Sequence, residues 1–320
     1  MNTCLHQFFI NIFILDKYVY LEYMSTRKKA LLVGCNYSTD SLNRLQGCIN
    51  DVVHMSQTLV DAFDYDLNNI CILRDDASVN ASMPTRANIV TALNALVAQS
   101  ANLDEIWFHY SGHGSQVKDA NGDESDGLDE VIVPTDFRTA GFIVDDDIFT
   151  ILQKSKCKTM LLFDSCHSGS ICDLQWSYQV NGQTITRTQT TNKAIPSNPN
   201  IFCFSGCKDT QTSADAYDSF QVQSVGAFTY SFLYALRMNH MNVDIYKLYA
   251  DLCTVLKTAG FSQIPVFSSS SPSATYTFMR SSYRGIVGLG GGGALLATPV
   301  QMNASMKSSN IRVSMKMVFF

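Results

Sequence analysis

The chain has 320 residues, of which 46% are hydrophobic and 16% are charged. This composition excludes an intrinsically disordered protein, and the length allows one large domain with a full hydrophobic core. Ten cysteines stand at irregular spacings without a secretory signal peptide, which indicates reduced thiols in a cytoplasmic protein rather than a disulfide scaffold. The apolar run at residues 8–15 is too short to cross a bilayer and the net charge is −5, so neither a membrane nor nucleic acid is expected as a partner.

Strand-like and helix-like stretches alternate along the body of the chain. Strands are predicted at residues 29–35, 69–74, 105–110, 158–164, 200–205 and 263–268, and helices at 49–62, 85–99, 145–153, 226–238 and 243–258. Such alternation is typical of an α/β fold with a mostly parallel central sheet flanked by helices. Residues 1–27 are expected to be an extension, either disordered or upstream of an alternative start. Residues 281–320 are expected to form a glycine-rich basic tail.

Two of the predicted strands are each followed directly by a residue that can do nucleophilic chemistry. His113 follows the strand at 105–110 in the segment Tyr110-Ser111-Gly112-His113-Gly114, and Cys166 follows the strand at 158–164. The carboxyl ends of parallel strands meet at one edge of a sheet, where ligands bind in open α/β folds. The two side chains are therefore expected to share one site.

The chemistry of a cysteine hydrolase needs these residue types. A thiol attacks a carbonyl as the thiolate, and a neighbouring imidazole such as His113 can take its proton. The tetrahedral intermediate needs donors for its oxygen, and the backbone N–H groups of Gly114 and Cys166 are suited to form this oxyanion hole. The alternative for each residue alone is a buried cysteine or a turn histidine without a catalytic role.

Six motifs follow one another between residues 28 and 278. They are Gly47-Cys48-Ile49-Asn50-Asp51-Val52, Tyr110-Ser111-Gly112-His113-Gly114, Asp126-Gly127-Leu128-Asp129-Glu130-Val131-Ile132, Val144-Asp145-Asp146-Asp147, Asp164-Ser165-Cys166-His167-Ser168-Gly169-Ser170 and Ser205-Gly206-Cys207-Lys208-Asp209. In this order they resemble the metacaspases, which are calcium-dependent cysteine peptidases with a caspase-like fold. Asp164-Ser165-Cys166 stands where true caspases carry Gln-Ala-Cys, which favours a metacaspase.

The resemblance implies a division of the chain and a specificity. One peptidase domain is expected at residues 28–280, with a large-subunit-like part at 28–174, a polar and mobile linker at 175–199 and a small-subunit-like part at 200–280. By resemblance, the primary specificity pocket is formed by Cys48, Asp51, Ser111 and Asp164. Two carboxylates beside the nucleophile would pair with a substrate Arg or Lys and repel Asp. The alternative for Asp51 is a charge that stabilises the start of a helix.

Acidic residues form a second group. Residues 119–130 partly match the ligand spacing of an EF-hand, but Glu124 stands where that loop requires glycine and a strand-like segment follows, so an EF-hand is rejected. Clustered carboxylates still suit Ca²⁺ better than a softer metal. By resemblance, the calcium ligands are Asp129, Asp145, Asp146 and Asp173. The alternative is a solvated acidic hairpin and a helix N-terminus.

These observations predict a monomeric calcium-dependent cysteine endopeptidase that cleaves protein or peptide substrates after Arg or Lys through a Cys–His dyad. A peptidase of this specificity is expected to nick its own linker, where Arg187 and Lys193 are the candidates. Two other classes stay open. One is a hydrolase of the same clan without calcium dependence, and the other is a caspase-like binding module without activity.

Overall fold

The computed structural model describes residues 27–76, 83–119, 122, 127–166, 168, 171–172, 174–182, 184–190, 196–206, 214–218, 223–281 and 314–315. All of the predicted N-terminal extension except Arg27 and most of the predicted basic tail lie outside these residues. Asp173 and Lys193 also lie outside them.

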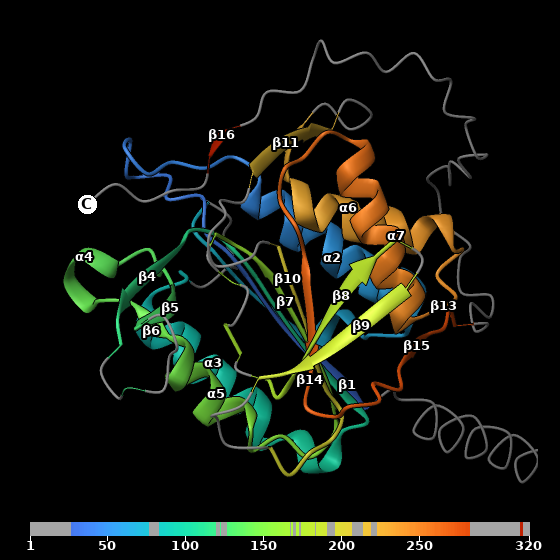
Figure 1. The fold of residues 1–320 in the computed structure, drawn as a ribbon. Coiled ribbons are helices and arrows are strands. Elements are labelled where there is room, and N and C mark those ends of the chain that lie inside the picture. Colours follow the sequence, from blue (N-terminus) through green and yellow to red (C-terminus); the bar gives the residue numbers. More distant parts are fainter. Residues whose placement is uncertain are drawn as a thin grey trace, which may run out of the picture.

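The centre of the fold is an eight-stranded sheet (Figure 1). Its strands run in the order β2 (Ile70–Arg74), β1 (Lys28–Gly34), β3 (Glu105–Ser111), β7 (Lys158–Asp164), β10 (Ile201–Ser205), β14 (Val266–Ser269), β8 (Trp176–Asn181) and β9 (Thr184–Gln189). The first five are parallel, and each of the last three is antiparallel to the strand before it. A mostly parallel sheet was predicted from the alternation of strands and helices, and this prediction is confirmed.

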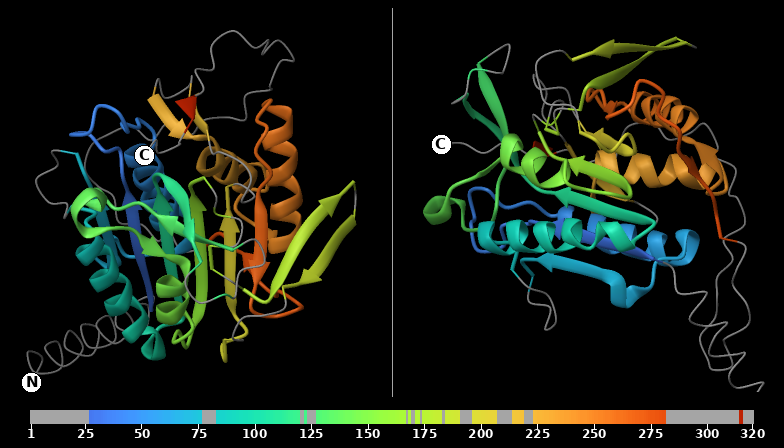
Figure 2. Two further views of the ribbon diagram at one scale, coloured as in Figure 1. Left: turned by 60° about the vertical axis from the view of Figure 1, so that its left-hand side comes forward. Right: turned by 90° about the horizontal axis from the view of Figure 1, so that it is seen from below.

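Helices cover both faces of this sheet, which gives three layers (Figures 1 and 2). One face carries α3 (Arg86–Ala98) and α5 (Asp145–Leu152), and the other carries α2 (Cys48–Phe63), α6 (Ala227–Met238) and α7 (Ile245–Thr258). Successive side chains of β3 alternate between the two cores: Phe108 packs on the α3 side and Trp107 on the α2 side. Because both faces of the central strands are buried, these strands are mostly apolar instead of alternating between apolar and polar residues.

Three smaller sheets surround the central one. The first joins β4 (Gly114–Lys118), β5 (Leu128–Ile132) and β6 (Ile143–Val144), with the short helix α4 (Phe137–Ala140) in the connection. The second joins β12 (Gln223–Gly226), β11 (Ala214–Asp218) and β16 (Ser314–Met315), and the third pairs β13 (Val243–Asp244) with β15 (Thr277–Phe278). The helix predicted from residue 243 therefore begins two residues later, where the Asp244 side chain caps it.

The prediction of a mobile linker at residues 175–199 is wrong for most of these residues. Residues 176–181 and 184–189 form the hairpin β8–β9, which extends the central sheet beyond β14 and stands out at its edge in Figure 2. Gly182 makes the turn with φ of +64°, a backbone conformation that glycine adopts without steric cost. In the part of the chain that the structure describes, no helix combines the length and apolarity needed to span a membrane.

Candidate active site

The two segments predicted to carry the catalytic residues emerge from neighbouring strands. β3 and β7 pair in parallel register from Glu105 opposite Lys158 to Ser111 opposite Asp164. The N–H of Gly112 donates to the Asp164 carbonyl at 3.3 Å and so extends this pairing past the strand ends. Each strand thus delivers its functional residue, His113 or Cys166, two positions after it ends, at the same edge of the sheet.

The main chains of the two segments are in direct contact at Gly114. A Cβ atom built on Gly114 would lie 2.0 Å from the carbonyl oxygen of Cys166 and 3.1 Å from the Cβ of Ser165. No side chain fits in that space, so only glycine allows the contact. The close backbone approach expected for an oxyanion hole is therefore present, while the donor roles of Gly114 and Cys166 stay predictions.

The imidazole of His113 is held by a backbone carbonyl. Its Nε2 lies 2.7 Å from the carbonyl oxygen of Asn43, and both residues are buried. A carbonyl oxygen can only accept, so Nε2 carries the ring hydrogen and Nδ1 is the basic nitrogen. The Tyr37 ring packs against the imidazole with 4.7 Å between centroids. The ring is thereby fixed in orientation and tautomer.

Two buried tyrosines hold the backbone of His113. The Tyr110 hydroxyl donates to the His113 carbonyl at 2.7 Å, and the His113 N–H donates to the Tyr37 hydroxyl at 3.0 Å. The Tyr37 hydroxyl in turn donates to the Val133 carbonyl at 2.6 Å. Burial raises the pKa of both tyrosines well above the ordinary value, so both hydroxyls remain protonated donors.

The loop that supplies the Asn43 carbonyl is organised by Asp40. The Asn43 side-chain amide donates to Asp40 Oδ2 at 2.9 Å, and the Asn43 backbone N–H donates to the Asp40 carbonyl at 3.2 Å. Arg138 binds the same carboxylate at 3.0 Å. The Asn43 amide and then Arg138 lower the pKa of Asp40 to about 2. Sequence reasoning missed Asn43, because a residue that acts through its carbonyl leaves no signal in its side chain.

The residues predicted to form the specificity pocket converge from three elements. Asp51 lies in the first turn of α2, and Ser111 and Asp164 are the last residues of β3 and β7. The Ser111 hydroxyl donates to Asp51 Oδ2 at 2.6 Å, and all three side chains are at most 1% exposed. Cys48, the first residue of α2, is also buried. The position of Asp51 in a first turn also meets the alternative expectation of a helix-terminal charge.

The start of α6 covers both carboxylates. The Gly226 N–H donates to Asp51 Oδ1 at 2.8 Å, while the N–H and hydroxyl of Thr229 donate to Asp164 Oδ2 at 2.9 and 2.8 Å. A Cβ on Gly226 would lie 2.0 Å from Asp164 Oδ2 and 2.6 Å from Asp51 Oδ2. The two carboxylates therefore face the same point, where the N-terminal dipole of α6 stabilises their charge. Sequence reasoning missed Gly226 and Thr229.

Three of the four predicted calcium ligands lie in the described residues. Asp129 is in β5 and Asp145 opens α5 directly after β6, which pairs with β5, and both side chains are buried. Asp146 is partly exposed, and its N–H donates to Asp145 Oδ1 at 3.0 Å. Within the described ranges, no three His, Cys, Asp or Glu side chains come together as a metal site. Buried carboxylates such as those of Asp129 and Asp145 are ligands of the kind that Ca²⁺ takes, and the calcium site itself stays a prediction.

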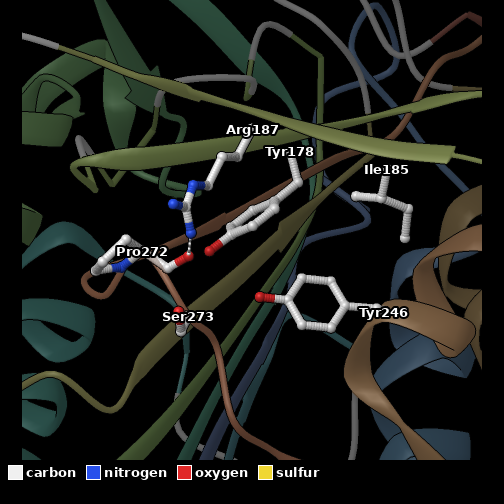
Figure 3. Close-up of a pocket in the computed structure, with 6 residues that line it drawn as sticks. All are labelled: Tyr178, Ile185, Arg187, Tyr246, Pro272 and Ser273. Atoms are coloured by element: carbon white, nitrogen blue, oxygen red, sulfur yellow. Dashed lines mark hydrogen bonds between the residues drawn. The ribbon is translucent and has the colours of Figure 1, made fainter.

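Arg187, a predicted self-cleavage position, lies in the edge strand β9. Its guanidinium donates to the Pro272 carbonyl and lies 5.2 Å from the ring centroid of Trp176. Figure 3 shows it beside a pocket of about 430 Å³ that is also lined by Tyr178, Ile185, Tyr246, Pro272 and Ser273. None of these other residues was predicted to be part of the active site. A strand is a poor protease substrate, which argues against cleavage at Arg187.

Comparisons with known proteins agree with this geometry. Residues 28–175 match the family model for the metacaspase peptidase C14 domain. Metacaspase-1 of Meyerozyma guilliermondii is 37% identical over 299 residues, which cover 79% of this chain and 72% of that protein. Metacaspase-1 of Schizosaccharomyces pombe is 35% identical, with 77% and 68% covered. Among solved structures, protein GSU0716 from Geobacter sulfurreducens aligns with a TM-score of 0.51 and 22% identity over 77% of this chain and 94% of that one.

The metacaspase match and the strand order of the central sheet agree on the fold. The mixed, mostly parallel sheet between two helical layers is the caspase-like α/β fold that the sequence predicted, and this prediction is confirmed. The relatives at 35 to 38% identity match most of the chain rather than one motif. The chain therefore belongs to the metacaspase family and is a cysteine endopeptidase.

Proposed function

We propose that this metacaspase is a calcium-dependent endopeptidase that cleaves protein substrates after Arg or Lys through Cys166 and His113. One observation supports the specificity: the buried carboxylates of Asp51 and Asp164 face one point beside Gly226, and Asp164 ends β7 two residues before Cys166. Two anionic groups at this place favour a cationic side chain before the scissile bond and disfavour an acidic one.

The tautomer of His113 decides which of its ring nitrogens acts as the base in the proposed reaction. His113 Nδ1 takes the thiol proton of Cys166, because its other nitrogen already donates to the Asn43 carbonyl. The thiolate then attacks the substrate carbonyl, and the N–H groups of Gly114 and Cys166 stabilise the oxyanion. The protonated His113 gives its proton to the leaving amine, and water hydrolyses the acyl-enzyme.

The calcium site would act through the small sheet β4–β5–β6. Asp129 lies near the start of β5, and the residue after its end, Val133, donates its N–H to the His113 carbonyl at 3.2 Å. The two residues are four steps apart along the chain, which corresponds to about 13 Å of strand. Bound Ca²⁺ would supply the positive charge that holds Asp129, Asp145 and Asp146 together. That charge would stabilise the strand on which the His113 backbone rests.

The free thiols of the described part support a reducing, cytoplasmic environment. We expect the enzyme to act as a monomer on protein and peptide substrates, without nucleic acid or membrane as a partner. These expectations depend on the sequence and are open to direct measurement.

Hydrolysis of reporter peptides that end in Arg, Lys or Asp, measured with and without Ca²⁺, tests the proposal. The wild type should cleave after Arg and Lys only, and Mg²⁺ should replace Ca²⁺ poorly. Cys166→Ala should lose at least about 10³-fold in rate. The matched control is Cys157→Ala, since Cys157 is also a buried thiol but precedes β7 at the opposite end.

Each part of the proposal can fail separately in this assay. Equal activity in Ca²⁺ and in a chelator would favour a calcium-independent hydrolase of the same clan. A preference for Asp would overturn the pocket assignment, and an active Cys166→Ala enzyme would overturn the nucleophile.

A further inference from the structure

A histidine that the proposed mechanism does not use lies next to the residues proposed to form the specificity pocket. His109 is in the middle of β3, on the same face as Ser111, and is fully buried. Its Nε2 lies 3.3 Å from the Thr229 hydroxyl, which in turn lies 2.8 Å from Asp164 Oδ2. A chain of hydrogen bonds thus joins a buried imidazole to a carboxylate of the pocket.

The chemistry of the three groups decides which one donates in each of these hydrogen bonds. A hydroxyl has one hydrogen, and a carboxylate oxygen can only accept, so Thr229 gives its hydrogen to Asp164. The Thr229 oxygen must then accept from His109, whose Nε2 carries the hydrogen. His109 therefore holds the hydroxyl rotor of Thr229 in the one orientation that serves Asp164.

Thr229 in turn fixes the plane of the Asp164 carboxylate. Its N–H and its hydroxyl both end on Oδ2, at 2.9 and 2.8 Å, so rotation of the carboxylate would break two hydrogen bonds at once. Asp51, which faces the same point of Gly226, is held in a similar way by the Ser111 hydroxyl and by the Gly226 N–H. The pocket thus contains two carboxylates of fixed orientation.

Fixed orientation matters differently for the two basic side chains. Arg presents a planar fork that needs acceptor oxygens in a defined plane, whereas the ammonium of Lys is a point charge that tolerates a rotated carboxylate. We propose that His109 and Thr229 are positioning residues that orient Asp164 and so favour substrates with Arg over those with Lys. The inference rests on the proposed preference for basic residues.

Thr229→Val tests the inference, because it removes the hydroxyl and keeps both the shape and the backbone N–H. We expect kcat/KM on Arg peptides to fall about 10- to 100-fold, mainly through KM, with a smaller loss on Lys peptides. The ratio of Arg to Lys activity should therefore fall. Thr229→Ser, which restores a hydroxyl, should recover most of the ratio, and His109→Phe should lower it without removing the Thr229–Asp164 bonds.

The matched control is Thr159→Val. Thr159 is equally buried and its hydroxyl is hydrogen-bonded, but it lies at the opposite end of β7 from Asp164. This variant should keep the wild-type ratio. Alkylation of Cys166 by iodoacetamide should proceed at the wild-type rate in the His109 and Thr229 variants, because the dyad is intact.

An unchanged ratio of Arg to Lys activity in Thr229→Val and His109→Phe would overturn the inference and leave only a structural role. A fall in kcat with unchanged KM on both substrates would overturn it as well. If Thr229→Val does not fold, the ratio in His109→Phe decides. A wild-type enzyme without preference for basic residues would instead refute the proposed function, so the two failures are distinguishable.

Discussion

Gly114→Ala is expected to disable the enzyme without unfolding it. The new Cβ would lie 2.0 Å from the Cys166 carbonyl oxygen, whereas ordinary contact begins at 3.4 Å. One of the two main chains must therefore move by about 1.4 Å. Gly114 also pairs with Ile132 of β5, so the movement is transmitted to the strand behind it. Both contacts are between backbones, and no flexible side chain can absorb the shift.

The size of the effect follows from this displacement. A misplacement of 1 Å costs about 100-fold in rate, which corresponds to about 2.7 kcal/mol of transition-state stabilisation. Overpacking costs about 1 to 3 kcal/mol of stability, so the domain should still fold. The measurement is kcat/KM on an Arg reporter peptide, together with thermal unfolding followed by circular dichroism.

Gly182→Ala provides the matched control. Gly182 has φ of +64°, and a Cβ atom added to it would have no other atom within 4 Å, so alanine there adds strain of about 1 to 2 kcal/mol without any clash. Both variants should lose similar stability, but only Gly114→Ala should lose activity. A Gly114→Ala enzyme with nearly wild-type kcat/KM would refute the contact between the two catalytic segments.

Three further changes test other parts of the structure. The pKa of Asp40 is lowered from 3.8 to about 2, so its stabilising effect is present above pH 3.8 and is lost as the pH falls through about 2. Asp40→Asn should therefore melt lower than the wild type near neutral pH, and the difference in Tm should vanish near pH 2. Asp145→Asn should raise the Ca²⁺ concentration needed for half-maximal activity, while Asp147→Asn, in the same turn but exposed, should not. Mass spectrometry of calcium-treated enzyme should find self-cleavage lost in Lys193→Gln and retained in Arg187→Gln, and the reverse pattern would mean that β9 opens.

The central strands could be predicted because both of their faces are buried. β7 lies at the predicted residues 158–164, and α2 begins within one residue of its predicted start. The meeting of His113 and Cys166 at one edge followed from the rule that parallel strands end together. Apolar runs and the direction of strands are local properties, so a single sequence carries them.

The sequence of β8 contains a signal for a hairpin, but the polar composition of β9 obscures it. Trp176, Tyr178 and Val180 stand at every second position of β8, and the dipeptide Asn181-Gly182 at its end is a typical sequence signal of a hairpin. β9, however, is an edge strand with most of its side chains in solvent, and three of its six residues are threonine. A polar composition therefore suggested a mobile linker where the chain forms strands.

Asn43, Gly226 and Thr229 could not be predicted for a different reason. Asn43 acts through its carbonyl and Gly226 through its N–H, and neither group depends on the type of side chain. Thr229 reaches Asp164 across 65 residues of sequence. Contacts of this kind exist only once the fold has formed, and no local pattern encodes them.

The position of β14 has a consequence for how the protein is made. β14 lies between β10 and β8, so residues 266–269 separate two strands that are synthesised much earlier. Until these residues leave the ribosome, the facing edges of β8 and β10 have no partner. Pairings between such distant segments form slowly, and open strand edges attract other chains. A nascent or truncated chain that stops before residue 266 should therefore aggregate, and its production in cells should depend on chaperones.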